Sequence, residues 1–252
     1  MNNQQYSPSG FALLPPVVKN LLIINILFFV ATHACRNFFG IDLSNLLGLY
    51  YYESAQFHPY QIFTYIFMHA DFSHLFFNMF ALWMFGAVIE NYWGWKRFLV
   101  YYLITGIGAG LVQEAVYSIR IYQIMAQLPP ELAYMVKNNN WELLPQYMHY
   151  KSQLINLYSL LNVGTIGASG SVFGLLLAFG MMFPNSLIYI YFLFPMKAKW
   201  LVIGYGAIEL WLGIANRNGD NVAHFAHLGG MLFGIFLILL WRKKERNPYY
   251  EY

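Results

Sequence analysis

Charged side chains are scarce in this chain of 252 residues, because Asp, Glu, Lys and Arg together make up only 10% of it. Soluble domains average about 25% charged residues. With 59% hydrophobic residues as well, the composition excludes an ordinary soluble domain and indicates a membrane protein. The net charge is only +3, and the basic residues are scattered or lie at predicted helix ends, so the sequence offers no surface for nucleic acid.

Cysteine is almost absent, and with Cys35 alone the chain has neither an internal disulfide nor a cysteine metal cluster. The zinc-protease pattern His-Glu-x-x-His is also missing. His224 and His227 are close enough to share a metal ion, but no Asp or Glu lies beside them in the sequence. We therefore expect no metal site and no cofactor.

Long apolar segments dominate what is present, and a helix that crosses the hydrocarbon core needs about 20 mainly apolar residues. Six segments are candidates: about Val17 to Ala34, Phe72 to Trp93, Phe98 to Tyr117, Ser169 to Phe183, Trp200 to Ile214 and His224 to Trp241. They predict an all-α membrane protein with a bundle of six transmembrane helices. Because residues 1–10 are polar and carry no Lys or Arg, we expect the first helix to be retained rather than cleaved as a signal.

A polar stretch from Ser118 to Asn162 separates the third segment from the fourth and is too long for a bare connection. Pro129-Pro130-Glu131 is typical of a helix start, and apolar residues are scattered through Trp141 to Leu161. We expect this insert, about 118–162, to form one or two short helices on the outer surface, and the sequence assigns it no function.

Orientation follows from the basic residues beside the helix ends. They gather between the second and third segments, between the fourth and fifth, and after the sixth: Lys96, Arg97, Lys197, Lys199, Arg242, Lys243, Lys244 and Arg246. With six spans these places share one side, which we assign to the cytoplasm together with both termini. We expect residues 1–16 to be a cytoplasmic segment, residues 17–242 the transmembrane domain, and residues 243–252 a cytoplasmic tail.

Polar residues on three different helices are expected at one depth in the membrane, where such groups are costly and mark function. Counted from the cytoplasmic ends of their helices at about 1.5 Å per residue, Ser169 and His227 both lie about 21 Å up, and Asn78 about 22 Å. The same count puts Glu209 only about 14 Å up its helix, so no carboxylate is expected at the level of Ser169. Residues 162–168 must then enter the membrane as non-helical chain, which is tolerated where it lines a water-filled cavity.

The run Gly167-Ala168-Ser169-Gly170 places a serine at a helix N-terminus, among free backbone N–H groups and the positive end of the helix dipole. Both features would stabilise an oxyanion, and the glycines allow close approach of a substrate. The competing interpretation is a helix cap followed by a small-residue packing face from Gly170 to Gly174. Ser171 points elsewhere on the helix.

The run from Ala223 to Gly230 opens the sixth helix and contains His224 and His227. Gly230 and Gly234 form a small-residue pair that lets this helix pack tightly against a neighbour. If that neighbour is the fourth helix, His227 can reach Ser169 and act as its base. The alternative is a structural histidine bonded between helices, which is our interpretation of His224.

His74 and Asn78 are four residues apart on the second helix, so both can direct hydrogen-bond donors towards one point, as an oxyanion site requires. Their alternative role is polar contact between helices. We interpret His69 and Asp71 as structural. Glu209 is an acid inside the membrane and is expected to pair within the bundle.

Together these motifs resemble those of the rhomboid family of intramembrane serine proteases. The family pattern Gly-x-Ser-Gly occurs as Gly167–Gly170, and the pattern Ala-His-x-x-Gly occurs as Ala226–Gly230. The pattern His-x-x-x-Asn occurs as His74 to Asn78, and Glu90 matches the glutamate at the foot of the same helix. The resemblance covers about residues 59–240, and three motifs in this order on these helices are highly specific.

The resemblance implies a Ser–His dyad without an acid, in which Ser169 is the nucleophile and His227 the base. It implies that His74, Asn78 and the Ser169 N–H hold the oxyanion, and that Phe173 packs on the His227 ring. It also implies that the substrates are single-span membrane proteins in the lipid bilayer and that the fifth helix gates their entry. The short tails resemble those of bacterial members, so we expect the protein in the bacterial inner membrane.

One departure from the family pattern puts the anchoring of the first outer loop in doubt, because Tyr60-Gln61 stands where many relatives have Trp-Arg. Two other functions compete with the protease. The first is an inactive relative that binds or escorts client membrane proteins, although such relatives usually lack the nucleophile or the base. The second is a transporter, whose inverted repeats are not visible in the sequence.

Overall fold

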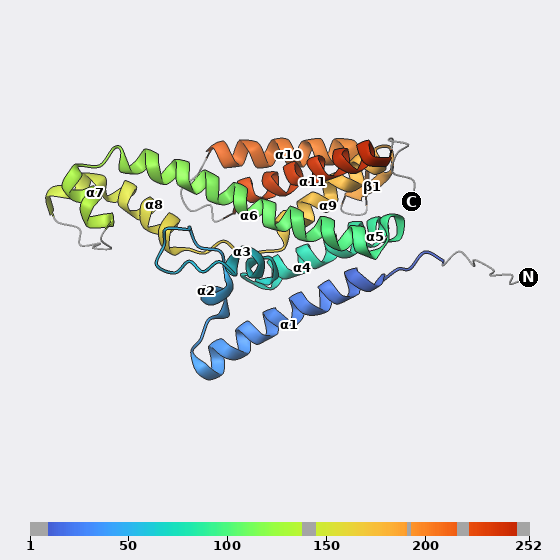
Figure 1. The fold of residues 1–252 in the computed structure, drawn as a ribbon, viewed down its shortest axis with the longest axis horizontal. Coiled ribbons are helices and arrows are strands. Elements are labelled where there is room, and N and C mark those ends of the chain that lie inside the picture. Colours follow the sequence, from blue (N-terminus) through green and yellow to red (C-terminus); the bar gives the residue numbers. More distant parts are fainter. Residues whose placement is uncertain (1–9, 138–144, 191–192, 216–221, 246–252) are drawn as a thin grey trace, which may run out of the picture.

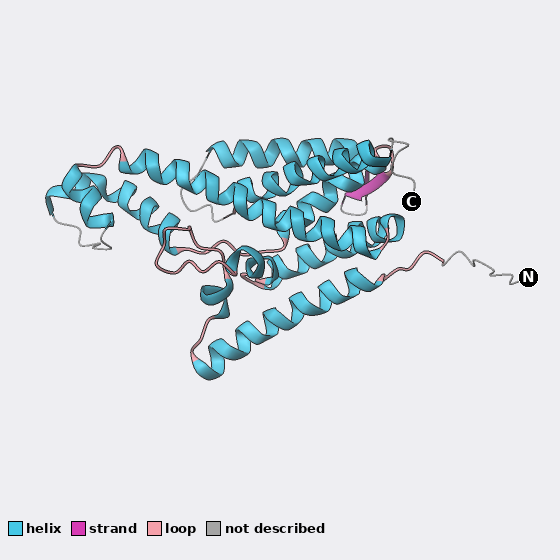
Figure 2. Ribbon diagram, in the orientation of Figure 1, coloured by secondary structure: helices cyan, strands magenta, loops and turns pink. Residues whose placement is uncertain are grey.

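The chain folds into a bundle of long helices with one short antiparallel strand pair (Figure 1, Figure 2). The computed structural model describes residues 10–137, 145–190, 193–215 and 222–245. Within these residues, helices long and apolar enough to cross a membrane occupy Pro16–Phe39, Phe72–Trp93, Trp95–Met125, Ala198–Ala215 and His224–Lys243. A sixth apolar helix, Ser169–Met182, is shorter. The chain is therefore a multi-pass membrane protein with the expected all-α, six-helix bundle.

The bounds of the second, fourth, fifth and sixth predicted spans agree closely with expectation, whereas the first continues past Ala34 to Phe39 and the third past Tyr117 to Met125. In chain order the elements are α1 (Pro16–Phe39), α2 (Leu43–Leu47), α3 (Gln61–Thr64), η1 (Tyr65–Phe67), α4 (Phe72–Ala81), η2 (Leu82–Gly86), α5 (Ala87–Trp93), α6 (Trp95–Met125), α7 (Pro130–Lys137), η3 (Pro145–Tyr150), α8 (Lys151–Asn162), α9 (Ser169–Met182), β1 (Leu187–Ile190), β2 (Phe194–Lys197), α10 (Ala198–Ala215) and α11 (His224–Glu245). The elements α4, η2 and α5 form one continuous helix with a π-helical turn at η2, so the second predicted helix has its expected bounds.

Helices α6, α9 and α11 pack against one another at the centre of the bundle. Helix α1 lies on the side of α4, η2 and α5, and α10 lies on the opposite side, against α9 and α11 (Figure 1). Helix α1 begins and α11 ends at the same end of the bundle (Figure 1), as an even number of spans requires. The central triplet is what positions the residues singled out in the sequence.

Glu90, on α5, holds the start of α1. Its two carboxylate oxygens accept hydrogen bonds from the backbone N–H groups of Val17, at 2.9 Å, and Val18, at 2.8 Å. The first N–H groups of a helix have no partner within the helix, and Pro16 at the first position has no N–H to satisfy. Glu90 is buried, so this contact is a structural one that lies at the foot of the bundle.

The third span is longer than predicted, because α6 continues past Tyr117 to Met125. The added turns pack against α7 and α8 in a second, smaller hydrophobic core, whose buried members are Tyr51, Ile121, Leu128, Leu132, Val136 and Leu157. The insert thus forms short helices, as expected, and they stand on the extended end of α6 (Figure 1). Trp141, part of the predicted apolar stretch, lies outside the described residues.

Gln61 anchors the loop between α1 and α4, so this loop is held by bonds other than those of the family's Trp-Arg pair. Its side chain is fully buried, and its Nε2 donates to the carbonyl oxygens of Gln56, at 2.9 Å, and Leu46, at 3.2 Å. Its Oε1 accepts from the backbone N–H groups of His58, at 3.1 Å, and Tyr50, at 3.4 Å. One amide therefore satisfies four backbone groups that would otherwise be unpaired in the interior.

The strand pair β1–β2 connects α9 to α10 and was not predicted. Its register pairs Leu187 with Lys197 and Ile190 with Phe194. The segment between the two helices is a short apolar run that contains Pro195. From such a short run alone, a strand cannot be told from a helix or a loop. A two-stranded ribbon gains its stability from what it packs on, which a single sequence does not show.

Candidate active site

Ser169 is the first residue of α9, and the chain that precedes it is fixed in a non-helical conformation. Thr165 forms an antiparallel bridge with Leu49, with N–O distances of 2.9 and 2.7 Å. The N–H of Gly167 donates to the carbonyl oxygen of Tyr65 at 2.9 Å. Gly167 has φ of +134°, a conformation that a residue with a Cβ rarely adopts. The loop between α1 and α4 therefore determines where α9 begins.

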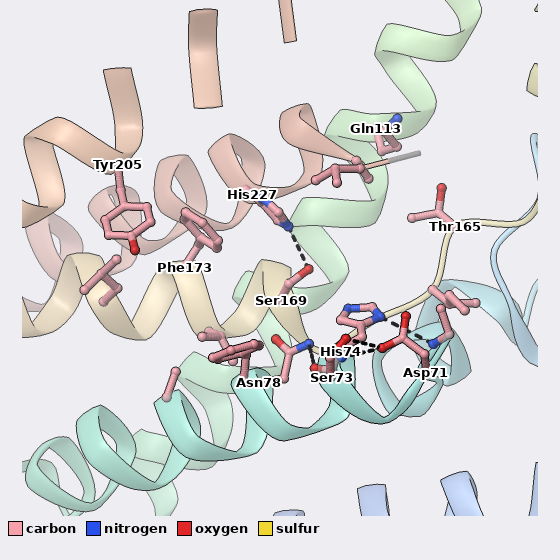
Figure 3. A pocket seen from close by; sticks show the side chains of 18 of the residues that line it. Asp71, Ser73, His74, Asn78, Gln113, Thr165, Ser169, Phe173, Tyr205 and His227 are labelled. Atoms are coloured by element: carbon pink, nitrogen blue, oxygen red, sulfur yellow. Dashed lines mark hydrogen bonds between the residues drawn. The ribbon is translucent and has the colours of Figure 1, made fainter. Parts of the chain in front are cut away.

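Ser169 and His227 are in hydrogen-bond contact, with Oγ and Nε2 separated by 2.8 Å (Figure 3). They come from α9 and α11, which are brought together by glycines. A Cβ on Gly230 would lie 1.9 Å from the carbonyl oxygen of Gly170, so the two backbones leave no room for a side chain. The expected meeting of the fourth and sixth helices is thus present and depends on Gly230, whereas a Cβ on Gly170 would lie 2.4 Å from Ala109 Cβ on α6.

Phe173 packs flat on the imidazole of His227, with ring centroids 4.2 Å apart and an angle of 6° between the planes. Phe173 also makes a T-shaped contact with Tyr205 on α10, with ring centroids 6.1 Å apart. Ser171 points away from the site, and its Oγ donates to the carbonyl oxygen of Tyr102 at 2.8 Å. Both expectations for these residues are confirmed, and the aromatic contact restricts the imidazole to one plane.

Glu209 provides a carboxylate at the level of Ser169, and the expectation that none lies there is wrong. Its Oε2 is 2.9 Å from Nδ1 of His227 and 2.6 Å from Nδ1 of His224. Counting from Ala198, where α10 begins, adds only about 3 Å to the depth of Glu209. The count treated all spans as parallel to the membrane normal and left out the reach of the side chains, although membrane helices are commonly tilted. A usable signal was present: an acid inside the membrane needs a partner, and two histidines share one face of the next span.

His74 and Asn78 face the same site from α4 (Figure 3). The His74 ring lies against Gly167, since a Cβ there would be 2.9 Å from its Nε2 and 3.5 Å from Ser169 Oγ. Nδ1 of His74 accepts a long hydrogen bond of 3.4 Å from the N–H of Ala70, which leaves Nε2 directed to the site. Asn78 is buried, and its Nδ2 donates to the carbonyl oxygen of His74 at 2.9 Å.

Asp71 and His69 support the start of α4, as predicted. The Asp71 carboxylate accepts from Ser73 Oγ, at 2.6 Å, and from the N–H of His74, at 2.8 Å, and these bonds lower its pKa. Burial, and then the neighbouring His74, lower the pKa of His69 to about 4. His69 is therefore neutral at pH 7 and packs as an uncharged ring, 5.1 Å from the ring of His74.

The Ser169 hydroxyl and the His227 imidazole lie at the wall of a cavity of about 1330 Å³ (Figure 3). Ser169, His227, His74 and Asn78 all line it. In one direction it passes between α4 and α10, and in the other it reaches polar residues of α6 and α8, such as Gln123 and Asn156. A volume of this size holds many water molecules, so the hydroxyl and the imidazole have access to both water and a polypeptide.

Glu209, His224 and His227 also form a set of groups that metal ions use, with one ligand atom from each lying within 4.8 Å of the others. All three side chains are buried and are already joined by the two hydrogen bonds to Glu209 Oε2. These two bonds occupy Nδ1 of both imidazoles and leave Nε2 of His227 facing Ser169.

Comparison with known proteins agrees with this geometry. The model of the Rhomboid domain matches residues 56–121 and 143–244, which together are more than half of the chain. Rhomboid-like protein 11, chloroplastic, of Arabidopsis thaliana is 27% identical over 88% of this chain and 64% of its own length. Rhomboid protein 1, mitochondrial, of Saccharomyces cerevisiae is 30% identical over 67% of this chain and 38% of its own length.

This chain thus spans less than two thirds of either relative. The matched segments contain the helix N-terminus with Ser169 and the glycine-lined contact that brings His227 to it. The resemblance drawn from three short motifs is confirmed over whole helices, and the chain belongs to the rhomboid family.

Proposed function

We propose that the protein is an intramembrane serine endopeptidase that cleaves membrane proteins within or near their membrane segment. The observation that carries the proposal is the 2.8 Å contact between Ser169 Oγ and His227 Nε2 at the wall of a large cavity. A serine hydroxyl is a weak nucleophile unless a base accepts its proton in the same step. Here the base is in contact, its ring is held in plane by Phe173, and the cavity supplies room for a peptide.

In the proposed reaction, Ser169 Oγ attacks the scissile carbonyl carbon while its proton passes to His227 Nε2. The C–Oγ bond forms as the carbonyl π electrons move to oxygen. When the tetrahedral intermediate collapses, the C–N bond breaks and the proton on Nε2 goes to the leaving amine. Water from the cavity then attacks the acyl carbon and gives a proton to Nε2. Collapse of this second intermediate breaks the C–Oγ bond, returns the proton from Nε2 to Ser169 Oγ and releases the new carboxyl end of the product.

The developing oxyanion would be stabilised by the backbone N–H of Ser169 and by side chains of α4. The N-terminal end of α9 presents N–H groups that have no helical partner, and its dipole favours negative charge. His74 Nε2 is directed to this point, and Asn78 supplies an amide one turn further along the same face. Donors that are in place before the reaction stabilise the transition state without reorganisation.

The proposed substrates are single-span membrane proteins, and the shape of the cavity supports this class. Its apolar part lies between α4 and α10, where Phe77, Met84 and Leu201 line it. A transmembrane segment could enter there from the bilayer, provided that α10 moves or the segment unwinds. The backbone of an unwound segment loses its internal hydrogen bonds, which is tolerated only beside a polar, hydrated site.

A covalent probe tests the proposal directly. Purified wild-type protein in detergent is treated with a fluorophosphonate, and the labelled residue is located by mass spectrometry. We expect the phosphonyl adduct on Ser169, because its proton is removed by His227, and no adduct on Ser171, whose Oγ is bonded to a backbone carbonyl. Absence of label on Ser169 in folded protein, or binding of a single-span client without turnover, would favour an inactive, escorting relative.

We further propose that both termini and the β1–β2 strand pair face the cytoplasm of a bacterial inner membrane, because the basic residues gather on that side of the bundle. Alkaline phosphatase fused after Lys243 is expected to be inactive, and the same reporter inserted near Gln127 is expected to be active. Active enzyme in the first fusion and inactive enzyme in the second would reverse the orientation. Green fluorescent protein at the same two positions should give the opposite pattern of signal.

A further inference from the structure

We propose that Glu209 is a positioning residue of the reaction, so that the machinery is a set of Ser169, His227 and Glu209 instead of a two-residue dyad. The inference rests on the proposed function, since it assigns a role through His227. It differs from the expectation drawn from the family motifs, which contain no acid on the fifth span.

Glu209 Oε2 contacts Nδ1 of His227 at 2.9 Å, and the other ring nitrogen, Nε2, contacts Ser169 Oγ at 2.8 Å. An ionised carboxylate can only accept hydrogen bonds, so the ring proton of neutral His227 lies on Nδ1. The lone pair then lies on Nε2, where a base needs it. The acid therefore selects the one tautomer of His227 that can remove the proton of Ser169.

The carboxylate also matters once the proton has moved. When Nε2 takes the proton from Ser169, the ring becomes a cation whose other N–H points at Glu209 Oε2. Glu209, His224 and His227 are each only 8% exposed, so water screens this pair weakly. Among the described residues, His74 on α4 and Tyr205 on α10 line the same cavity as the ring, and Arg120 on α6 donates to the carbonyl oxygen of Gly213, whereas Nδ1 of His227 is in contact with the Glu209 carboxylate. Glu209 is thus the group that stabilises the imidazolium.

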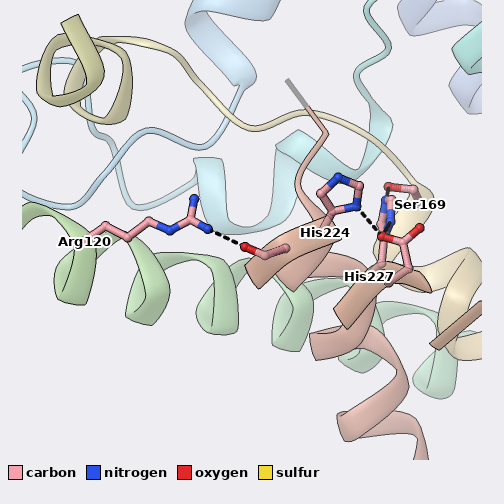
Figure 4. A network of polar contacts seen from close by, with 6 residues as sticks. Arg120, Ser169, His224 and His227 are labelled. Atoms are coloured by element: carbon pink, nitrogen blue, oxygen red, sulfur yellow. Dashed lines mark hydrogen bonds and ion pairs between the residues drawn. The ribbon is translucent and has the colours of Figure 1, made fainter. Parts of the chain in front are cut away.

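His224 holds Glu209 from a second direction (Figure 4). Its Nδ1 is 2.6 Å from the same oxygen, Oε2, so the carboxylate cannot turn without losing both histidines. One turn along α10 from Glu209, Gly213 lets α10 approach α11 closely, because a Cβ there would lie 2.9 Å from the ring of Phe225. Arg120 of α6 donates to the carbonyl oxygen of Gly213 at 2.9 Å, so α6 is also bonded to α10 near its contact with α11 (Figure 4).

Two simpler roles for Glu209 make different predictions. If Glu209 served only as a polar contact between helices, a bond to any donor of α11 would suffice. Removal of the carboxylate would then change stability and leave the chemical step unchanged. A metal site would use Glu209, His224 and His227 as ligands, and activity would then depend on the ion. A positioning role requires contact with the nitrogen opposite Ser169, and its removal must change the chemical step and its pH dependence.

The test compares purified wild type with Glu209→Gln, Glu209→Asp and His224→Asn, using cleavage of a single-span substrate and the rate of fluorophosphonate labelling. For Glu209→Gln we expect kcat to fall on the order of 10²- to 10⁴-fold, with little change in KM, because the tautomer is no longer fixed. Labelling should slow in parallel, and Glu209→Asp should recover part of the loss. His224→Asn is expected to cost about 10-fold.

The pH profile separates chemistry from structure. Without the carboxylate the imidazolium of His227 is less stable, so the acidic limb of kcat/KM for Glu209→Gln should move to lower pH. The matched control is Glu114→Gln, whose parent carboxylate on α6 accepts a backbone N–H from Tyr52 at 2.9 Å, a bond that the amide can also accept. This control should keep both the rate and the profile of wild type.

The possible results distinguish the proposed protease function from the positioning role of Glu209. Wild type that neither cleaves nor labels at Ser169 removes the proposed function itself. Wild type that cleaves, with Glu209→Gln equal to it in kcat and profile, overturns the positioning role and leaves the protease. Loss of wild-type activity in a chelator, restored by Zn²⁺, would replace the positioning role by a metal site, whereas activity that is unchanged by the chelator supports it.

Discussion

Ser169→Ala is expected to abolish cleavage of a single-span substrate in detergent or in vesicles, with kcat lower on the order of 10⁴-fold or more. The reason is chemical: alanine has no oxygen to form the acyl-enzyme, and among the described residues that line the cavity no other hydroxyl is hydrogen-bonded to His227. His227→Ala should cost about as much, because the hydroxyl of Ser169 loses the acceptor that lies 2.8 Å away. The measurement is the initial rate of product formation, followed by gel or by a fluorogenic substrate.

Two comparisons make this result specific to the mechanism. Ser171→Ala, on the same helix, removes a hydroxyl that is bonded to the carbonyl oxygen of Tyr102, and this variant should keep a rate near that of wild type. The double variant of Ser169 and His227 should be no slower than either single variant, since groups that act as a unit are not additive. Cleavage by Ser169→Ala at the wild-type rate would show that Ser169 is not the nucleophile.

The parts of the fold that the sequence predicted well are those with a local cause. The span Phe72–Trp93 and the start of α9 at Ser169 have their expected bounds, because Asp71 caps the one and glycines precede the other. Helix α6 was expected to end at Tyr117, where its apolar character falls, but it continues to Met125. The added turns are stabilised by contacts with α7 and α8, and those contacts join residues distant in the chain.

The residues of the candidate site likewise fall into those that a local sequence pattern indicated and those that it did not. Ser169, His227, His74 and Asn78 were recognisable because each belongs to a short motif and because three helices placed polar residues at one depth. Glu209 belongs to no such motif, and a count of residues along one helix did not show that its side chain reaches Nδ1 of His227, because it takes no account of helix tilt or side-chain reach. Gln61 gave even less indication, since a buried amide with four backbone partners has no sequence signature.

Gly230→Ala tests whether the close approach of α9 and α11 is what assembles the site. The added Cβ would lie 1.9 Å from the oxygen and 2.7 Å from the carbon of the Gly170 carbonyl, and both are backbone atoms that cannot turn aside. Helix α11 must therefore shift away from α9, and His227, on the same helix face one turn earlier, shifts with it. Overpacking of this kind destabilises by about 1–3 kcal/mol.

The effect on catalysis should exceed the effect on stability. A displacement near 1 Å between reacting groups can cost about 10²-fold in rate, because the Ser169–His227 hydrogen bond is lost while the helices remain folded. We therefore expect Gly230→Ala to reduce kcat about 10²-fold or more, with a moderate fall in Tm, and to slow fluorophosphonate labelling equally. Gly204→Ala on α10 is the matched control, because a Cβ there has no atom within 4 Å, and this variant should match wild type in both measurements. If Gly230→Ala cleaves as fast as wild type, the hydroxyl and the imidazole do not depend on glycine packing for their contact, and some other element of the bundle must hold them together.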